Sequence, residues 1–231
     1  MNPQIFSKPK NGYETANFMN KLNKELIHDF WKSRSQSSTI RWTSKELLNF
    51  EIDYLNERLK SENERIRILD LGSGHGELSR LITKKGDNLL GVDFIPDYSN
   101  SFNARDNHLF TCSNVVDFVS NQEFDLVLFM GVVQFLEIEE ELRVYEQIST
   151  MLSENGIAVI KSQVGIEDEI IINEYSDALK AEYSSRYPHI SQQSNAVSKF
   201  LNIKEVIEYP SSFNHFPNSK HVAFICKNKG K

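Results

Sequence analysis

The residues with the clearest chemical meaning are three glycines at alternating positions, Gly72, Gly74 and Gly76, preceded by Asp70. They follow a short apolar segment and precede a helical pattern, so we predict a tight turn between a strand and a helix. Glycine is needed there because the backbone adopts positive φ and because a side chain would block a ligand lying against the backbone. We therefore expect a ligand at the carboxyl end of this strand, where open α/β sheets form their crevices.

The spacing of the glycines distinguishes two kinds of adenosine ligand. A dinucleotide site uses Gly-x-Gly-x-x-Gly to seat a pyrophosphate on a helix N-terminus, whereas this turn has Glu77 where the third glycine would fall. Glu77 and Asp70 bring negative charge to the turn, which opposes a phosphate and suits a cation. We infer a ligand with an ammonium group and a sulfonium. Asp93 ends the next predicted strand, and a carboxylate there can accept both ribose hydroxyls of an adenosine.

Residues from about 64 to 165 resemble the core of a class I S-adenosylmethionine-dependent methyltransferase. Asp70 and the three glycines match the first motif of that family, and Asp93 matches its ribose-binding acid. The adenine-binding stretch of the family resembles residues 113–115, where Asn114 stands in place of the more usual Asp. An amide oxygen can still accept a hydrogen bond from the adenine amino group.

Residues 124–136 resemble the fourth strand of the family and the turn that follows it. The resemblance implies that the backbone near Met130 and Gly131 lines the methionine end of the cofactor. Gln134 occupies a position that many relatives fill with His. Residues 152–160 resemble the fifth-strand region of the family, so several motifs support the match.

The resemblance implies S-adenosylmethionine as methyl donor, S-adenosylhomocysteine as product, and a small-molecule acceptor methylated on oxygen or nitrogen. A sugar or a secondary metabolite is the acceptor we consider, and the oligomeric state is left open. The implied cofactor-binding residues are Asp70, Gly72, Ser73, Gly74, Gly76, Asp93, Phe94, Asn114, Val115, Met130 and Gly131.

Methyl transfer is an in-line displacement that depends on holding acceptor, methyl group and sulfur in line. A hydroxyl acceptor needs a general base at some stage, whereas a neutral amine can attack without one. We take His189 and His215 as candidate catalytic residues, with His189 preferred, and Gln134 as a positioning group. The alternative for each histidine is a structural or merely exposed position. Further candidates are His75, Tyr175 and Tyr183 as proton acceptors, and Trp31, Trp42, Phe94 and Phe135 as aromatic walls.

Strands alternate with helices from residue 66 onward, which predicts a mainly parallel sheet with helices on both faces. The predicted strands are 66–71, 88–93, 108–112, 124–130, 157–160, 203–209 and 221–227, and the predicted helices are 77–85, 138–152, 166–183 and 195–201. We therefore expect an α/β Rossmann-like sheet of seven strands, in which the resemblance implies an antiparallel last strand.

The N-terminal quarter of the chain is predicted to be separate from this sheet. Residues 1–62 are expected to form a loose arm and a helical lid, with helices over 14–31 and after a capping box at 43–46. The serine-rich segment 32–38 is a candidate mobile lid or an ordinary helical connection. The methyltransferase domain is expected to span residues 63–231, with a helical insertion at about 166–202.

Composition limits the alternatives. A net charge of −6 argues against a broad phosphate-binding surface, so we expect no nucleic-acid partner. The longest apolar run is too short to cross a bilayer, and we expect a cytoplasmic protein without membrane insertion. Cys112 and Cys226 are expected to be reduced, buried thiols. The acidic run 137–141 is expected to be the solvated first turn of a helix. The sequence contains no clustered His, Asp or Cys pattern that would predict a metal site.

Two other functions remain open on the sequence alone. The turn after residue 130 lacks the Pro-Pro-aromatic motif and the cysteine of base methyltransferases, although some RNA and protein methyltransferases lack these marks as well. A catalytically silent subunit that keeps the fold and the cofactor is the other alternative. Nothing in the glycine turn is disrupted, which favours an active enzyme.

Overall fold

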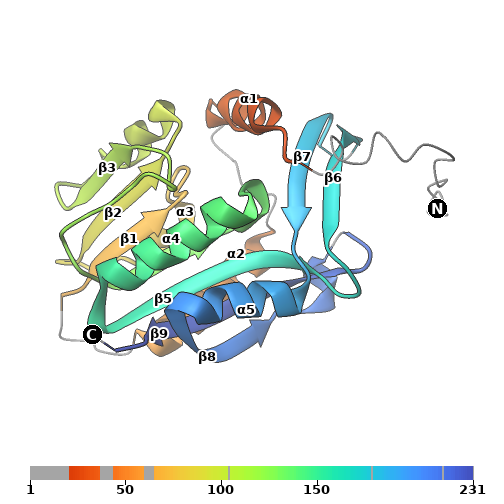
Figure 1. The fold of residues 1–231 in the computed structure, drawn as a ribbon. Helices are drawn as coiled ribbons and strands as arrows, with labels where there is room; N and C mark the ends of the chain where they lie inside the picture. The colour runs from red at the N-terminus through yellow and green to blue at the C-terminus, as the bar shows by residue number, and fades with distance from the viewer. Residues whose placement is uncertain are drawn as a thin grey trace, which may run out of the picture.

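A seven-stranded sheet in the order β3-β2-β1-β4-β5-β9-β8 forms the centre of the molecule (Figure 1). The computed structural model describes residues 21–36, 44–59, 65–103, 105–177, 179–214 and 216–230. The first five strands in this order run parallel, and β9 is antiparallel to both of its neighbours, so the predicted fold class is confirmed. The strands are β1 (Arg67–Leu71), β2 (Asn88–Asp93), β3 (His108–Cys112), β4 (Phe124–Met130), β5 (Leu152–Gly165), β8 (Leu201–Glu208) and β9 (Ser219–Asn228).

Helices cover both faces of this sheet (Figure 1). One face carries α4 (Ile138–Met151) and α5 (Ile190–Phe200), and the other carries α2 (Lys45–Arg58) and α3 (Glu77–Ile82). Strand β4 is apolar on both sides, because Val127 and Phe129 belong to the first core while Leu126 and Leu128 belong to the second. Burial of both faces is why this strand reads as a continuous apolar run.

The two helices of the predicted lid have different roles. Helix α2 is part of the main core, to which it contributes Leu47, Tyr54 and Leu55. Its cap is Ser44, whose hydroxyl accepts the Leu47 N–H at 3.3 Å, one residue later than the capping box at 43–46 suggested. Helix α1 (Lys24–Ser35) alone lies apart from the core, at the top of the view in Figure 1.

The predicted helix over 166–183 is wrong, and with it the all-helical insertion at 166–202. This segment forms a two-stranded antiparallel sheet of β6 (Ile170–Ser176) and β7 (Ala181–Tyr187), and only α5 of the insertion is helical. Three consecutive isoleucines, 170–172, favour extended backbone because β-branched side chains are restricted in a helix. Lys180, at φ +50°, turns the chain back into β7.

Three shorter corrections concern the ends of elements and the thiols. Helix α1 begins at Lys24 after an Asn23 cap, so residues 21–23 of the predicted 14–31 helix are not helical. Residues 32–35 of the serine-rich segment are the end of this helix, whereas residues 14–20, residues 37–38 and Trp42 lie outside the described residues. Helix α3 ends at Ile82 instead of residue 85. Cys226 is buried as expected, but Cys112 is exposed.

Candidate functional site

The glycine turn leaves β1 at the carboxyl edge of the sheet and is tied to the neighbouring strand. The N–H groups of Gly72 and Ser73 donate to the Val92 carbonyl at 2.8 and 3.0 Å. Gly72 and Gly74 have φ values of +73° and +51°. A Cβ on Gly72 would lie 2.3 Å from the Val132 side chain, whereas a Cβ on Gly74 would meet nothing within 4 Å. The first glycine is thus required by packing, and the second keeps a space open beside the backbone.

A second open position lies at the end of β4. Gly131 has a φ of +75°, and a Cβ built on it would also meet nothing within 4 Å. Its N–H donates to the Lys161 carbonyl of β5 at 2.9 Å, which holds the turn at the carboxyl edge of the sheet. Because β1 and β4 are adjacent, Gly74 and Gly131 leave room for one extended group lying across both strand ends.

Asp93 ends β2 beside this space and binds the glycine turn directly. Its Oδ2 accepts the Gly74 N–H at 2.9 Å, and its Oδ1 accepts the Ile95 N–H at 3.1 Å. Burial raises the pKa of this carboxyl to about 6, although the backbone N–H donors oppose the shift. Each oxygen keeps a second lone pair, so Asp93 can accept hydroxyl groups of a ligand while it holds the turn.

The other predicted cofactor residues differ in what they can offer. Asp70 is buried at the end of β1. Gly76 caps α3 at φ +65°, and a Cβ there would lie 2.6 Å from Phe102, so this glycine also serves packing. Ser73 and Met130 lie next to the two open glycines and are only partly buried. These residues frame the space, and the polar ligand contacts would come from Asp93 and the backbone.

The remaining predicted cofactor residues are Phe94, after β2, and the predicted adenine-binding residues Asn114 and Val115, after β3. Phe94 is 36% exposed, and its ring centroid lies 5.8 Å from that of His28 on α1. Asn114 is exposed, and its Oδ1 already accepts the Val116 N–H at 3.0 Å. The Val115 side chain is buried in the core, which leaves only its backbone for a ligand. Phe94 and Asn114 are therefore the side chains available on this side.

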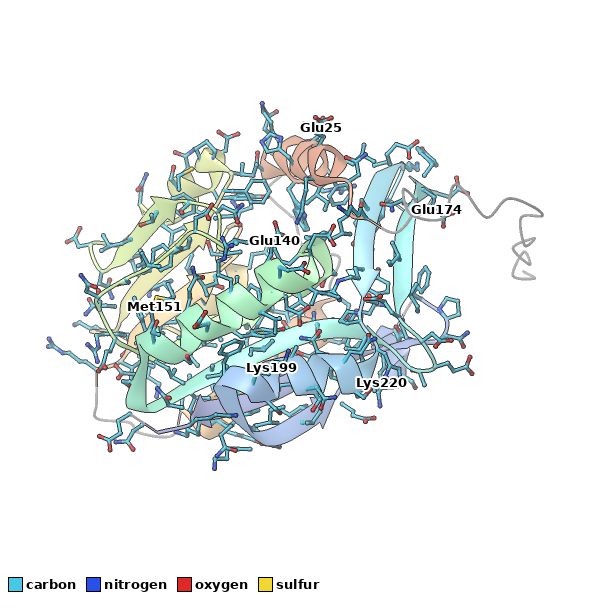
Figure 2. The ribbon with its side chains drawn as sticks, in the orientation of Figure 1. Glu25, Glu140, Met151, Glu174, Lys199 and Lys220 are labelled. Carbon is cyan, nitrogen blue, oxygen red and sulfur yellow. The ribbon has the colours of Figure 1, made fainter. Side chains whose placement is uncertain are left out.

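Helix α1 spans the carboxyl edge and is bonded on both sides of it. On one side, Lys24 Nζ donates to the Phe135 carbonyl at 2.9 Å and pairs with Glu140, whose position at the upper end of α4 is seen in Figure 2. On the other side, Ser35 Oγ donates to Asp97 Oδ2 at 3.1 Å, in the 3₁₀ helix η1 (Pro96–Ser101). The helix therefore forms a roof that bridges β4 and β2.

Four aromatic side chains join this roof to the rest of the site, and we call them the roof cluster: Phe30, Trp31, Phe135 and Tyr183. Trp31 meets Phe135 edge to face at 5.4 Å, and Phe135 meets Tyr183 at 6.1 Å. They come from α1, from the 3₁₀ helix η2 (Val133–Phe135) and from β7. Because η2 directly follows Gly131, the cluster lies immediately beyond the open end of β4.

Polar groups accompany the roof cluster. Gln134 Oε1 is buried and accepts no hydrogen bond from any described residue. Arg34 Nη2 donates to the Leu179 carbonyl at 3.0 Å, and its guanidinium lies 4.4 Å from the Phe30 ring centroid. Burial raises the pKa of the Tyr183 hydroxyl, so this group stays protonated and cannot serve as a base at neutral pH. The site thus offers Gln134 Oε1 as a hydrogen-bond acceptor and the Tyr183 hydroxyl as a protonated phenol.

His189, the preferred catalytic candidate, has a structural role at a helix end. His189 caps α5: its Nδ1 accepts the Ser191 N–H at 3.3 Å, and its Nε2 lies 3.0 Å from the Ile166 carbonyl. Both ring nitrogens therefore have structural partners. His215 lies outside the described residues. Of the further candidates, His75 Nδ1 is 2.7 Å from Ser101 Oγ, and Tyr175 is 54% exposed on β6.

Two buried charge pairs near the site were not anticipated. Lys161, opposite Met130 in the sheet, has its Nζ 3.4 Å from Oε1 of Glu51, which is fully buried on α2. Arg186 of β7 pairs with Glu141 of α4, and both side chains are almost fully buried. The expectation of a solvated 137–141 turn is thus wrong for Glu141. In each pair the glutamate lies on a helix, at a position that falls on the buried face by its spacing. A charge at such a position was the signal that the sequence offered.

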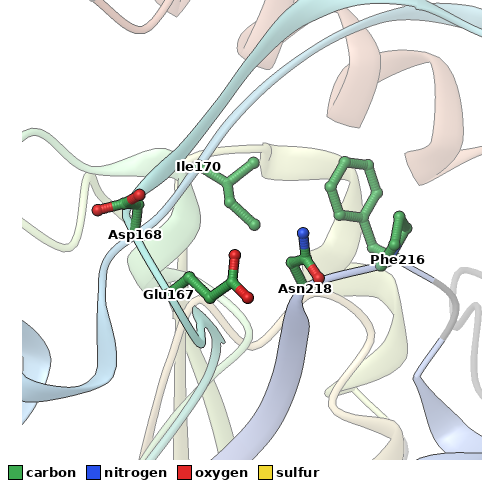
Figure 3. A pocket seen from close by; sticks show the side chains of 6 residues that line it. Glu167, Asp168, Ile170, Phe216 and Asn218 are labelled. Carbon is green, nitrogen blue, oxygen red and sulfur yellow. The ribbon is translucent and has the colours of Figure 1, made fainter.

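A separate pocket lies at the base of the β6–β7 hairpin (Figure 3). It has a volume of about 290 Å³ and is lined by Glu167, Asp168, Ile170, Phe216, Pro217 and Asn218. Figure 3 shows the Glu167 and Asn218 side chains pointing toward one another, with the Asp168 carboxylate turned away. The lining includes none of the predicted cofactor residues, so this pocket is distinct from the glycine turn.

Two searches of the described ranges bear on other kinds of site. Among those residues, no three or more His, Cys, Asp or Glu side chains are grouped so that they could hold a metal ion. Within the same part of the chain, every helix is too short or too polar to cross a membrane.

A family model described as "Methyltransferase domain" matches residues 69–160. The ubiquinone biosynthesis O-methyltransferase of Rickettsia bellii (strain OSU 85-389) is 22% identical over 201 residues, which cover 82% of this chain and 78% of that protein.

Solved structures resemble the whole chain. The 1,6-didemethyltoxoflavin-N1-methyltransferase of Burkholderia thailandensis, solved with 1,6-didemethyltoxoflavin and S-adenosylhomocysteine, is 12% identical with a TM-score of 0.69, covering 96% of this chain and 93% of that one. The N-methyltransferase NodS of Bradyrhizobium japonicum WM9, in complex with S-adenosylhomocysteine, is 11% identical with a TM-score of 0.65, covering 88% and 99%. At these identities the likeness establishes the fold.

Proposed function

We propose that this chain is a class I S-adenosylmethionine-dependent methyltransferase and that it methylates an oxygen or nitrogen of a small planar acceptor held beneath helix α1. The cofactor and enzyme class expected from the sequence are confirmed by the family match and by the named relatives. The observation that carries the acceptor proposal is the roof cluster, which gathers four aromatic side chains from three separate elements beyond the turn at Gly131.

The cofactor fits the residues at the carboxyl edge. Gly74 and Gly131 leave open the positions that a Cβ would fill, and Asp93 has lone pairs for the ribose hydroxyls. When bound, S-adenosylmethionine supplies an electrophilic methyl group on a sulfonium. We assign Asp93 to the ribose, Phe94 and Asn114 to the adenine, and the Met130–Gly131 backbone to the methionine end.

The chain's own part in the transfer is to position the acceptor and to exclude water. Aromatic faces favour a flat acceptor and stabilise a neighbouring cation, and a roof over the strand ends keeps the reacting atoms dry. Gln134 cannot take up a proton, so we assign it to orientation: its Oε1 accepts the N–H or O–H of the attacking group. This arrangement suits a neutral amine, which attacks without a base and releases its proton to solvent afterwards, or a phenol, which is acidic enough to lose its proton to solvent as the base.

The names of the relatives leave the acceptor atom open. One relative is an O-methyltransferase of ubiquinone biosynthesis, and the two solved structures are N-methyltransferases, one of them with the acceptor 1,6-didemethyltoxoflavin bound. We therefore keep both oxygen and nitrogen as the proposed acceptor atom. The aromatic lining restricts the proposed acceptor from small molecules in general to planar ones.

Incubation with methyl-labelled S-adenosylmethionine and three separate pools tests the proposal: phenols, heteroaromatic amines and sugars. We expect label in one of the two aromatic pools. Label only in sugars, or only in a nuclease- or protease-sensitive fraction, would overturn the planar acceptor. Tight cofactor binding without turnover on any pool would support the silent subunit instead.

Gln134→Leu tests the orienting role, because leucine keeps the volume and removes the amide. We expect kcat/KM for the acceptor to fall about ten-fold or more, as for a lost hydrogen bond in a buried site, with unchanged affinity for S-adenosylmethionine. Gln122→Leu, at an exposed loop position, is the matched control and should change neither. An unchanged kcat/KM in Gln134→Leu would remove Gln134 from the site.

A further inference from the structure

A hollow of about 430 Å³ lies at the edge of the sheet opposite the glycine turn. It is formed by the loops that enter β2 and β3 and is lined by Thr83, Lys84, Lys85, Gly86, Arg105 and Asn107. Asp93 stands at the other end of β2, which at about 3.3 Å per residue puts it some 15–20 Å away. The hollow is therefore separate from the cofactor and acceptor space.

The lining carries three cations and no carboxylate. Lys84, Lys85 and Arg105 form no ion pair with any residue that the structure describes. Asp87, the acid of the same loop, is buried, and its carboxylate accepts the backbone N–H groups of Ile66 at 3.1 Å and Lys84 at 2.8 Å. Asp106 is exposed and is not part of the lining. The three cations therefore line the hollow without a paired carboxylate among the described residues, in a chain whose net charge is −6.

A buried histidine next to the hollow reports the same positive field. His108 follows Asn107, is 5% exposed, and neither of its ring nitrogens has a hydrogen-bond partner among the described residues. Burial lowers the pKa of His108, and the charges of Arg105 and Arg80 lower it further. The arginine charges are secondary to burial in this shift, and the positive potential that they add at this edge of the sheet favours an anion there.

We propose that this hollow binds a small phosphorylated molecule that carries at least two negative charges. Lysine and arginine are the side chains that bind phosphate, the lysine as a point charge and the guanidinium through paired N–H groups. The volume falls within the range of small-ligand pockets. A long polyanion is disfavoured, because only three cations line the hollow and the chain as a whole has a net charge of −6. The site is remote from catalysis, so the molecule acts as an effector or a tether instead of a substrate.

Calorimetric titration of the full chain with inorganic pyrophosphate tests the proposal. Lys85→Ala and Arg105→Ala each remove one cation from the lining, and we expect each to weaken pyrophosphate binding about ten-fold. Lys199→Ala is the matched control, since Lys199 is exposed on α5 (Figure 2) and its removal changes the net charge equally. The affinity for S-adenosylmethionine should be unchanged in all three variants, which shows that each is folded.

Three results would overturn the inference. The first is that the wild-type chain does not bind pyrophosphate at 50 mM salt. The second is that Lys199→Ala weakens pyrophosphate binding as much as the other two variants do, which would indicate unspecific attraction. The third is displacement of pyrophosphate by a single-stranded RNA at equal phosphate concentration, which would identify a nucleic-acid backbone as the ligand. Failure of the proposed acceptor function would leave all of these measurements interpretable, because none of them requires turnover.

Discussion

The ionisation of Asp93 should set the pH below which the cofactor is lost. Its carboxylate accepts backbone N–H groups from Gly74 and Ile95 and is assigned to the ribose hydroxyls. Burial raises its pKa from 3.8 to about 6 in the free protein. Ribose hydroxyls donate best to the ionised form, so binding of S-adenosylmethionine should require the deprotonated carboxylate and should weaken as the pH falls through 6.

The size of the effect follows from the ionised fraction. A group with a pKa of about 6 is roughly nine-tenths ionised at pH 7 and roughly one-tenth ionised at pH 5, so the apparent affinity should fall about ten-fold between these values. Stability has the opposite pH dependence. The folded state holds a proton that the unfolded state releases above 3.8, so the Asp93 contribution to the free energy of unfolding should fall by up to about 3 kcal/mol as the pH rises from 3.8 to 6.

Calorimetry from pH 5 to pH 8 measures the first effect, and urea unfolding from about pH 4 to pH 7 measures the second. Asp93→Asn should bind S-adenosylmethionine at least ten-fold more weakly at pH 7, about the loss of one charged hydrogen bond, and should show no pH step near 6. Asp106→Asn, an exposed acid at the opposite edge, is the control and should behave like the wild type. A pH step of equal size in Asp93→Asn, or unchanged affinity, would refute the assignment of Asp93 to the cofactor.

Three further predictions test the site and its supports. Gly74→Ala should stay folded, at a backbone cost of about 1–2 kcal/mol, and should bind the cofactor at least ten-fold more weakly by calorimetry. Gly72→Ala should lower the melting temperature more than Gly74→Ala does, because its Cβ would lie 2.3 Å from a neighbouring side chain. Arg186→Met should cost about 3–5 kcal/mol in urea unfolding by leaving Glu141 buried without its cation, and the double change with Glu141→Leu should recover most of it; no recovery would show that the pair is not the cause. His189→Ala should cost about 1 kcal/mol through its helix cap and leave kcat unchanged, so a lower kcat with intact cofactor affinity would restore it as a catalytic candidate.

The cofactor half of the site was predictable because its signals are local. Strands β2, β3 and β4 have the predicted bounds, since each is a short apolar run flanked by turn residues. The glycine turn follows the end of β1, and Asp93 is the last residue of β2. Adjacent parallel strands then bring those ends together, so sequence order alone places Gly74 next to Asp93.

The acceptor half was not predictable in the same way, because its partners come from distant parts of the chain. Apolar residues over 166–183 fit a helical spacing as well as a strand, and only pairing of β6 with β7 decides between them. Tyr183 was considered as a base, but burial among aromatic rings makes it part of a wall. The role of Glu141 could not be predicted from the sequence for the same reason, because its partner Arg186 lies 45 residues away along the chain.

The charge pair of Glu141 and Arg186 links the two halves mechanically. Arg186 belongs to the same strand as Tyr183 and also donates to the Leu136 carbonyl at 3.2 Å, directly after η2. Gln193 of α5 donates to Glu141 at 3.0 Å, so the hairpin, η2 and both helices of one face share a single buried network. A buried pair of this kind contributes little net stability but tolerates few geometries. We infer that its function is to fix β7 against η2, because a displacement there would open the roof cluster while leaving the cofactor turn intact.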